Sequence, residues 1–149
     1  MVCRCGTWAF IYITLIGSIW LANSVPLTKK AVVLFAHGSP DPAWHTHIHA
    51  IATKVKETNQ DINVCCAYLS HTQPSLLDAV TQLASAGIAE ISITPVFLGV
   101  GRHLREDLPK LLEEVKKAHP SLTIVTQPPL GENEQLINLM AQIASSRMA

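Results

Sequence analysis

The sequence lacks an excess of charge of either sign. Its 149 residues include 11 Lys and Arg against 11 Asp and Glu, so the formal net charge is zero with neutral histidines. A nucleic-acid binder that works by bulk positive charge is therefore excluded. Charged residues make up 15% of the chain and hydrophobic residues 48%, which argues against disorder. The length suits one domain with its own core.

Cysteine is scarce, with four in the chain. Cys3 and Cys5 lie near the start, whereas Cys65 and Cys66 are neighbours inside an apolar run. Adjacent residues of a strand point to opposite faces, so the second pair is poorly placed for a disulfide. No C-x-x-C motif is present, which argues against a zinc–thiolate site. We expect Cys65 and Cys66 to be small core residues.

Several catalytic signatures are missing as well. The H-G-S at His37 is similar to the oxyanion turn of α/β-hydrolases, but the chain has no G-x-S-x-G nucleophile elbow. Ala36 stands directly before His37, where histidine phosphatases have an arginine. The glycines of "GVGRH" lack the third glycine of a dinucleotide fingerprint. A hydrolase, a phosphatase and a dinucleotide-binding protein are therefore all disfavoured.

One long apolar run is present near the start. Residues 8–24 are almost free of polarity, and Arg4 is the only charged residue before them. A basic start, an apolar stretch and small residues at its end are typical of a secretory signal peptide, which would imply export. The run is also almost long enough for a membrane anchor, which takes about 20 apolar residues. A spurious extension from a wrongly chosen start codon is the third alternative. We expect residues 1–27 to stay outside the fold and residues 28–149 to form the domain.

Apolar runs and helical stripes alternate from Lys30 onward. Continuous apolar runs are typical of strands covered on both faces of a parallel sheet. Four such runs are present: Ala31–Ala36, Ile62–Leu69, Ala89–Leu98 and Leu122–Gln127. Four stripes at helical spacing follow them in turn: Trp44, Ile48, Ile51 and Val55; Leu76, Val80 and Leu83; Leu108, Leu111, Leu112 and Val115; Leu136, Leu139, Met140 and Ile143. The alternation predicts an α/β fold, a three-layer sandwich with a four-stranded parallel sheet.

Histidine follows three of the predicted strands. His37 ends the first strand, His71 follows the second, and His103 follows the third within "ITPVFLGVGRHLREDLP". Ligands of such folds bind outside the carboxyl ends of the strands, so the three segments should meet at the binding edge. A proline inside a helix loses a hydrogen bond, so Pro109 predicts a helix that starts close before it. His103 would then lie at or just before the helix start.

The histidines have a functional and a structural interpretation. Two or three imidazoles at one sheet edge suit a divalent transition metal, or proton transfer near neutral pH. Each could instead be a hydrogen-bonded loop residue. A further cluster, "HTHIH", places His45 and His49 on one helical face and His47 on another. It is either a solvated helix edge or a secondary metal-capture site.

Four segments in order resemble the CbiX/SirB family of sirohydrochlorin chelatases. They are "VVLFAHGSPDP", "PSLLDAV", "TPVFLGVGRHLREDLP" and "PPLG", between about residues 31 and 131. The resemblance implies a chelatase-like (flavodoxin-like) half unit. It also implies an ATP-independent lyase that inserts Co2+ or Fe2+ into sirohydrochlorin, on the way to cobalamin or sirohaem. The metal is then a substrate, and no tightly bound cofactor is implied.

The resemblance also implies site residues. His37 and His103 would be the catalytic pair, because a neutral imidazole can hold a metal ion and take a proton in turn. The carboxylates of the tetrapyrrole would be bound by Ser39, Arg102 and Arg105. Many family members carry acidic residues before "PSL", where this chain has Ser70, His71 and Gln73. His71 is therefore a further candidate metal ligand beside His37 and His103.

Two features of the chain bear on the chelatase interpretation: its length and the apolar leader. One four-stranded unit is half of the two-lobed chelatase architecture, so we expect a homodimer that completes the site at its interface. Members of the family normally work in the cytoplasm, whereas the leader suggests the periplasm or a membrane. The alternative hypothesis is a non-catalytic, exported metal-binding protein with a chelatase fold that uses His37, His71 and His103.

Overall fold

The computed structural model describes residues 29–146. The predicted leader, residues 1–27, lies outside the described residues, and its interpretation stays a prediction. Among residues 29–146, none of the helices combines the length and the apolar character that a membrane crossing requires.

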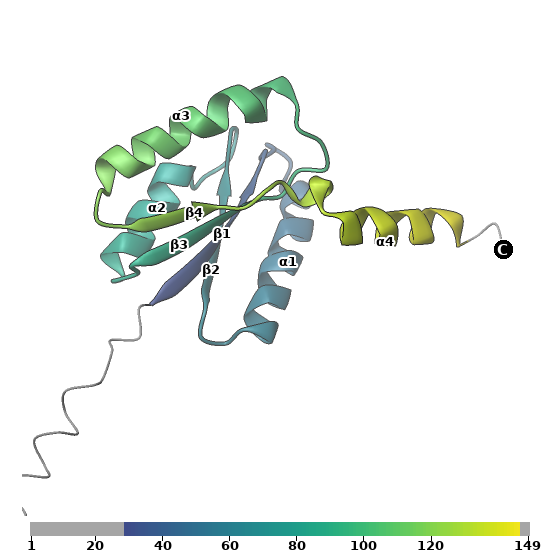
Figure 1. The fold of residues 1–149 in the computed structure, drawn as a ribbon, viewed down its shortest axis with the longest axis horizontal. Helices are drawn as coiled ribbons and strands as arrows, with labels where there is room; N and C mark the ends of the chain where they lie inside the picture. Colours follow the sequence, from purple (N-terminus) through teal and green to yellow (C-terminus); the bar gives the residue numbers. More distant parts are fainter. Residues whose placement is uncertain (1–28, 147–149) are drawn as a thin grey trace, which may run out of the picture.

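Four parallel strands form one sheet in the order β2–β1–β3–β4 (Figure 1). They are β1 (Lys30–Ala36), β2 (Asn63–Tyr68), β3 (Glu90–Pro95) and β4 (Thr123–Thr126). Strand β1 lies centrally, between β2 and β3. The predicted four-stranded parallel sheet is confirmed.

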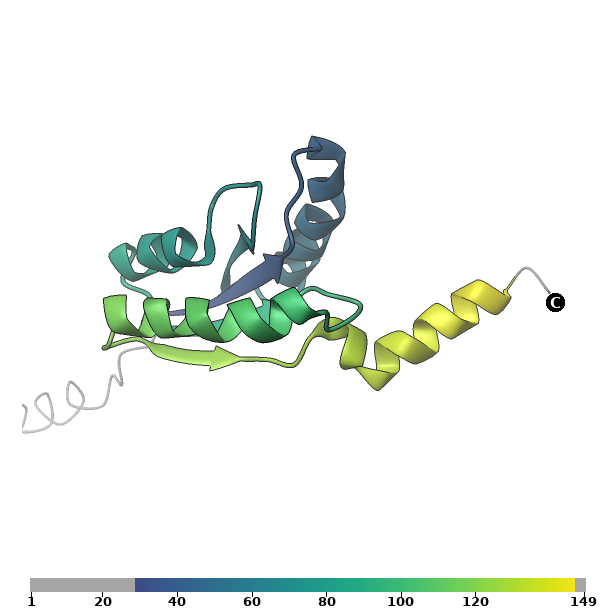
Figure 2. The same cartoon turned by 90° about the horizontal axis from the view of Figure 1, so that it is seen from above.

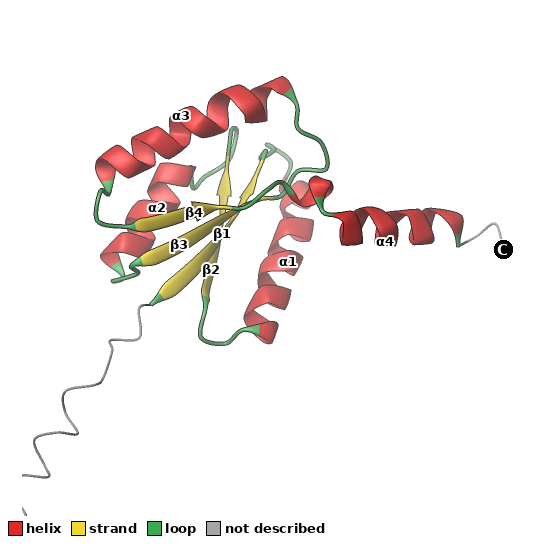
Figure 3. Ribbon diagram, in the orientation of Figure 1, coloured by secondary structure: helices red, strands yellow, loops and turns green. Residues whose placement is uncertain are grey.

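A helix follows each strand. The helices are α1 (His45–Thr58), α2 (Leu76–Ser85), α3 (Arg102–Ala118) and α4 (Glu134–Ser145), with short 3₁₀ turns η1 (Pro42–Trp44) and η2 (Leu130–Glu132). Helix α1 covers one face of the sheet, and α2 and α3 cover the other (Figures 1 and 3). The predicted three-layer sandwich is therefore confirmed.

The central position of β1 in the sheet explains why residues 31–36 are all apolar. Val33 and Phe35 are fully buried in the core under α2 and α3. Leu34 points to the opposite face, where it packs with Ile48 of α1 and with Tyr68 of β2. Because both faces of the strand are covered, alternation with polar residues would bury unpaired polar groups.

Helix α2 shows how local signals set the helix ends. Ser75 caps its N-terminus, and the side chain of Asp78 bonds back to the Ser75 backbone in a capping box. Gly87, with φ of 78°, turns the chain just after the C-terminus.

Two details of the predicted helices are wrong. Trp44 does not belong to the buried stripe of α1, because the helix begins at His45 and the indole is 66% exposed. Helix α3 begins at Arg102, so Pro109 lies in its interior and not close to its start. Pro109 is exposed, and the Arg105 carbonyl that loses its partner can bond to water instead.

Helix α4 forms as predicted, but it does not pack on the sheet. It projects away from the sandwich (Figures 1 and 2), and none of its described residues is buried. Ile143 is 64% exposed and Leu139 49%. The α1 side of β4 is consequently open: Ile124 packs into the core under α2 and α3, whereas Val125 points the other way and is 44% exposed.

Candidate functional site

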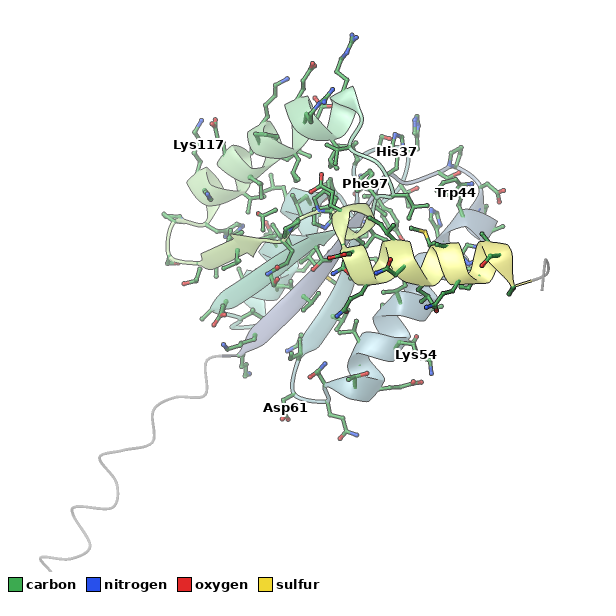
Figure 4. The ribbon with its side chains drawn as sticks, turned by 45° about the vertical axis from the view of Figure 1, so that its right-hand side comes forward. His37, Trp44, Lys54, Asp61, Phe97 and Lys117 are labelled. Carbon is green, nitrogen blue, oxygen red and sulfur yellow. The ribbon has the colours of Figure 1, made fainter. Side chains whose placement is uncertain are left out.

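His37 lies at the point where the chain connections change direction. From β1 the chain runs through α1 to β2 on one side, and later returns through α2 to β3 on the other side of β1. Ligands of open α/β sheets bind at such a switch point, outside the carboxyl ends of the strands. His37 follows the last residue of β1 and is exposed at that edge (Figure 4).

Backbone contacts fix the position of His37. Its carbonyl oxygen accepts a hydrogen bond from the Ser70 backbone N–H at 3.0 Å, and the Ser70 hydroxyl donates to it at 3.3 Å. The next residue, Gly38, has φ of 86°, and a Cβ there would overlap the Ser70 carbonyl oxygen. Only glycine therefore lets the loops after β1 and β2 come so close.

A polar groove of about 530 Å³ opens on one side of His37. Its polar lining comes from the loops after β1 and β2 and from α3: His37, Ser70, His71, Asp107, Lys110 and Glu114. His71 holds a left-handed backbone with φ of 62°, which is uncommon outside glycine, although histidine adopts it more often than most residues.

An apolar groove of about 330 Å³ opens on the other side of His37. It lies between the ends of β1 and β3 and the start of α1, and its apolar lining includes Trp44, Ile48, Phe97 and Leu98. Leu98 is 73% exposed, although it is a large apolar side chain at the rim. Figure 4 shows His37, Phe97 and Trp44 at the same end of the molecule. The imidazole of His37 thus lines both grooves.

The other predicted substrate-binding residues surround this edge. Arg102 and Arg105 are exposed in the first turn of α3, where no acidic side chain offsets their charge against the helix dipole. The Ser39 hydroxyl accepts a hydrogen bond from the Asp41 backbone N–H at 3.1 Å. The carbonyl of Ser39 accepts one from the Thr72 hydroxyl at 2.8 Å. Ser39 therefore shapes the loop after β1, and its contact with substrate stays a prediction.

The predicted metal ligands are brought together only in part. His37 and His71 line the same polar groove. His103 is the second residue of α3, at the helix start as predicted, but its side chain lies outside what the structure describes. Among the described residues, no group of three or more His, Cys, Asp or Glu side chains could hold a metal ion. The three-histidine site therefore stays a prediction.

Sequence reasoning missed the carboxylates of the polar groove. Asp107 and Glu114 lie seven residues apart on one side of α3, and Lys110 lies between them, 3.7 Å from an Asp107 oxygen. These carboxylates line the same groove as His71, although the sequence before "PSL" has none. The spacing of residues 107, 110 and 114 places them on one side of α3, next to its apolar stripe. The sequence does not show which loops this side of the helix contacts.

The two neighbouring cysteines behave as core residues, as predicted. Cys65 packs against the core under α2 and α3, and Cys66 packs against the core under α1. Burial, with a smaller contribution from Cys66, raises the pKa of the Cys65 thiol to about 11. Burial also raises the pKa of Cys66. Both thiols therefore stay protonated at neutral pH, and neither is a ready thiolate ligand.

Comparison with known protein families identifies the family to which this chain belongs. The CbiX family model matches residues 31–146, most of the chain. The chain belongs to the CbiX family. The motifs around His37 and His103 lie within the matched region.

The chain is also similar to curated sirohydrochlorin cobaltochelatases. The sirohydrochlorin cobaltochelatase of Methanothermobacter thermautotrophicus is 34% identical over 91 residues, which cover 61% of this chain and 63% of the relative. The chain thus spans slightly less than two thirds of that protein. The sirohydrochlorin cobaltochelatase of Methanosarcina acetivorans is 27% identical over 119 residues, which cover 75% of this chain and 92% of the relative.

Solved structures agree with the fold. A protein described as a cobalamin (vitamin B12) biosynthesis CbiX protein, from Marinobacter aquaeolei, superimposes with a TM-score of 0.69 at 28% identity. That match covers 80% of this chain and 97% of the neighbour. The sirohydrochlorin chelatase SirB of Bacillus subtilis, in complex with cobalt, has the same fold, with a TM-score of 0.69 at 19% identity. Here the match covers 79% of this chain but only 50% of SirB.

Proposed function

We propose that this protein of the CbiX family inserts a divalent metal ion, Co2+ or Fe2+, into sirohydrochlorin. The observation that carries the proposal is the position of His37 at the switch point, with an apolar groove on one side and a polar groove on the other. A relative that is matched over 92% of its length is a sirohydrochlorin cobaltochelatase, which supports the substrate.

Insertion requires two events at one place. The metal ion exchanges bound water for the pyrrole nitrogens, and two pyrrole N–H groups release their protons. The imidazole of His37 can hold the ion or accept a proton, and His103 is its predicted partner. The carboxylates of Asp107 and Glu114 give the polar groove further acceptors for protons and further oxygen ligands for an incoming cation.

The apolar groove suits the flat face of a tetrapyrrole. Trp44 and Leu98 are large apolar side chains that remain exposed there, and no other described element covers them. The exposed guanidinium groups of Arg102 and Arg105 lie at the start of α3, which follows the loop after β3 that lines this groove. They can pair with the carboxylates at the rim of the macrocycle.

Truncation of Trp44 should weaken sirohydrochlorin binding. Loss of an aromatic contact is worth about 0.5–1.5 kcal/mol beyond buried area, so the Trp44→Ala dissociation constant should rise about two- to twelve-fold. The absorbance change of sirohydrochlorin, titrated without metal, measures it. Trp44→Phe keeps an aromatic ring and should bind nearly as the parent does. Equal dissociation constants for the parent and Trp44→Ala would contradict binding of the macrocycle in this groove.

We further propose that the protein acts as a homodimer. The match to SirB covers about half of that chain, so the neighbour has the length of two such units. The chain also carries two apolar surfaces with nothing to cover them, the stripe of α4 and the open side of β4 at Val125. In a symmetric dimer the α4 helix of each copy can cover that side of the other copy.

A charge on the stripe of α4 should break the dimer. Ile143→Lys would place an ammonium group in the buried interface, so sedimentation equilibrium should show a monomer where the parent is a dimer. Asn138→Lys is the matched control, because Asn138 lies on the opposite face of α4 and its substitution should leave the dimer intact. A parent protein that sediments as a monomer, or an Ile143→Lys dimer, would contradict the proposed interface.

A further inference from the structure

The "HTHIH" segment is not a freely solvated helix edge. It forms the first turn of α1. The His45 Nε2 lies 3.2 Å from the Thr72 hydroxyl, and the His49 Nε2 lies 3.3 Å from the Tyr68 hydroxyl. Both imidazoles therefore face the end of β2, whereas His47 is exposed between them in the sequence.

The two imidazoles share one groove. Their ring centres are 6.3 Å apart, and the ring of His45 also packs 5.0 Å from that of Tyr68. A groove of about 480 Å³ is lined by both histidines and by Tyr68, Thr72 and Lys56. Burial raises the pKa of the Tyr68 hydroxyl, which stays neutral and can both donate and accept a hydrogen bond.

We propose that His45 and His49 form a second metal site, which binds a divalent transition-metal ion through their two imidazoles. Histidines at positions i and i+4 of a helix present their rings on one face, which is the arrangement that helical zinc sites use. Coordination of one ion by both Nε2 atoms would replace their contacts with the Tyr68 and Thr72 hydroxyls. Water molecules complete the coordination, with the Tyr68 and Thr72 hydroxyls close enough to bond to them.

The ligand type sets the class of metal. Imidazole nitrogen suits Zn2+, Cu2+, Ni2+ and Co2+, whereas Mg2+ and Ca2+ require oxygen ligands. No described Asp or Glu lines this groove, so a hard cation gains little there. Lys56 is exposed near the other end of α1, and its flexible ammonium group can turn to solvent. The site should therefore follow the order of imidazole affinity, with Cu2+ the tightest of these ions.

This site is separate from the one proposed for insertion. Neither His45 nor His49 lines the polar groove of His37 and His71. His45 does line the apolar groove beside His37, so a metal ion at the second site lies next to the proposed macrocycle site. Nothing in the insertion chemistry assigned to His37 requires His45 or His49.

Copper binding by the full chain, without tetrapyrrole, tests the second site. The parent is titrated with Cu2+ by calorimetry, and the number of bound equivalents is compared with that of His49→Gln and His45→Gln. Each of these variants should lose one equivalent. His47→Gln is the matched control, because it removes a histidine from the same turn but from another face, and it should bind as many equivalents as the parent.

Electron paramagnetic resonance identifies the ligands of the lost equivalent. The difference spectrum between the parent and His49→Gln should show Cu2+ bound by more than one imidazole nitrogen. Circular dichroism confirms the fold, which an exposed residue such as His49 does not determine. Unchanged stoichiometry in His49→Gln would overturn the proposal. Equal losses in His47→Gln and His49→Gln would also overturn it, because they would indicate adventitious binding along the segment.

Discussion

Replacement of His37 by alanine should reduce the rate of Co2+ insertion into sirohydrochlorin by about 10²–10⁴-fold, the usual contribution of one acid–base group. Loss of a metal ligand would add to this. The imidazole is exposed, and within the described part of the chain its one hydrogen-bond contact is with the adjacent Gly38 carbonyl at 3.3 Å, so its removal should leave the fold intact. The absorbance change of the tetrapyrrole under single-turnover conditions, corrected for spontaneous insertion, measures the rate.

Two other histidine variants make this result specific. His103→Ala should show a loss of the same order if the predicted pair is correct. His119 follows α3 at the far end of the helix, where its Nε2 lies 2.8 Å from the Thr81 hydroxyl. His119→Ala should therefore insert metal at the parent rate. If His37→Ala inserted metal at the parent rate, His37 would have no role in the insertion mechanism.

Gly38→Ala should destabilise the fold by about 4 kcal/mol or more, in the range reached only when a substitution disrupts the core or backbone packing. The added Cβ would overlap the Ser70 carbonyl oxygen and would approach the Tyr68 Cβ to 3.2 Å, at a φ of 86° that alanine rarely adopts. The loops after β1 and β2 would have to separate, which would also displace His37. Urea unfolding followed by circular dichroism measures the change.

Gly87→Ala is the matched control for the steric part of this effect. Gly87 has a similar φ of 78°, but a Cβ there would meet nothing within 4 Å. Only the left-handed backbone is penalised, at about 1–2 kcal/mol. If Gly38→Ala unfolded at the same urea concentration as Gly87→Ala, the close approach to Ser70 would not be a determinant of the site.

The strands were predictable because their signal is local. Both faces of β1 are covered, so residues 31–36 are apolar without interruption, and most of β2 is apolar as well, whereas β3 alternates buried isoleucines with polar residues. The carboxyl-edge position of His37 followed from strand direction. The position of His103 near the start of α3 followed from Pro109, although the helix begins earlier than Pro109 predicts. The order of the strands in the sheet was not predictable from the sequence, because it depends on the side of β1 to which each connection leads.

The errors have a common physical origin. An apolar stripe shows that a helix has an apolar face, but it does not show what covers that face. Trp44 and the stripe of α4 follow helical spacing in the sequence, but Trp44, Leu139 and Ile143 are exposed. Likewise, the spacing of Asp107 and Glu114 puts them on one side of α3, but only the fold shows that this side meets the loops after β1 and β2.

The start of α3 was misplaced for a different reason. Proline is expected near a helix start because it lacks an N–H group. In this fold Pro109 lies on an exposed side of α3, where water can satisfy the freed Arg105 carbonyl. Local propensity was therefore overridden by solvent exposure and by the packing of Leu104 and Leu108, which bury the first turns of the helix against the sheet.

The most direct test of the proposed function is a single-turnover insertion experiment with the parent protein in excess over sirohydrochlorin. Co2+ is added, and the absorbance of the tetrapyrrole is followed with and without protein. The position of His37 between the two grooves predicts insertion that is faster than the spontaneous reaction at the same metal concentration. A protein that binds Co2+ and sirohydrochlorin but leaves the spontaneous rate unchanged would contradict chelatase activity and would support a non-catalytic metal-binding role.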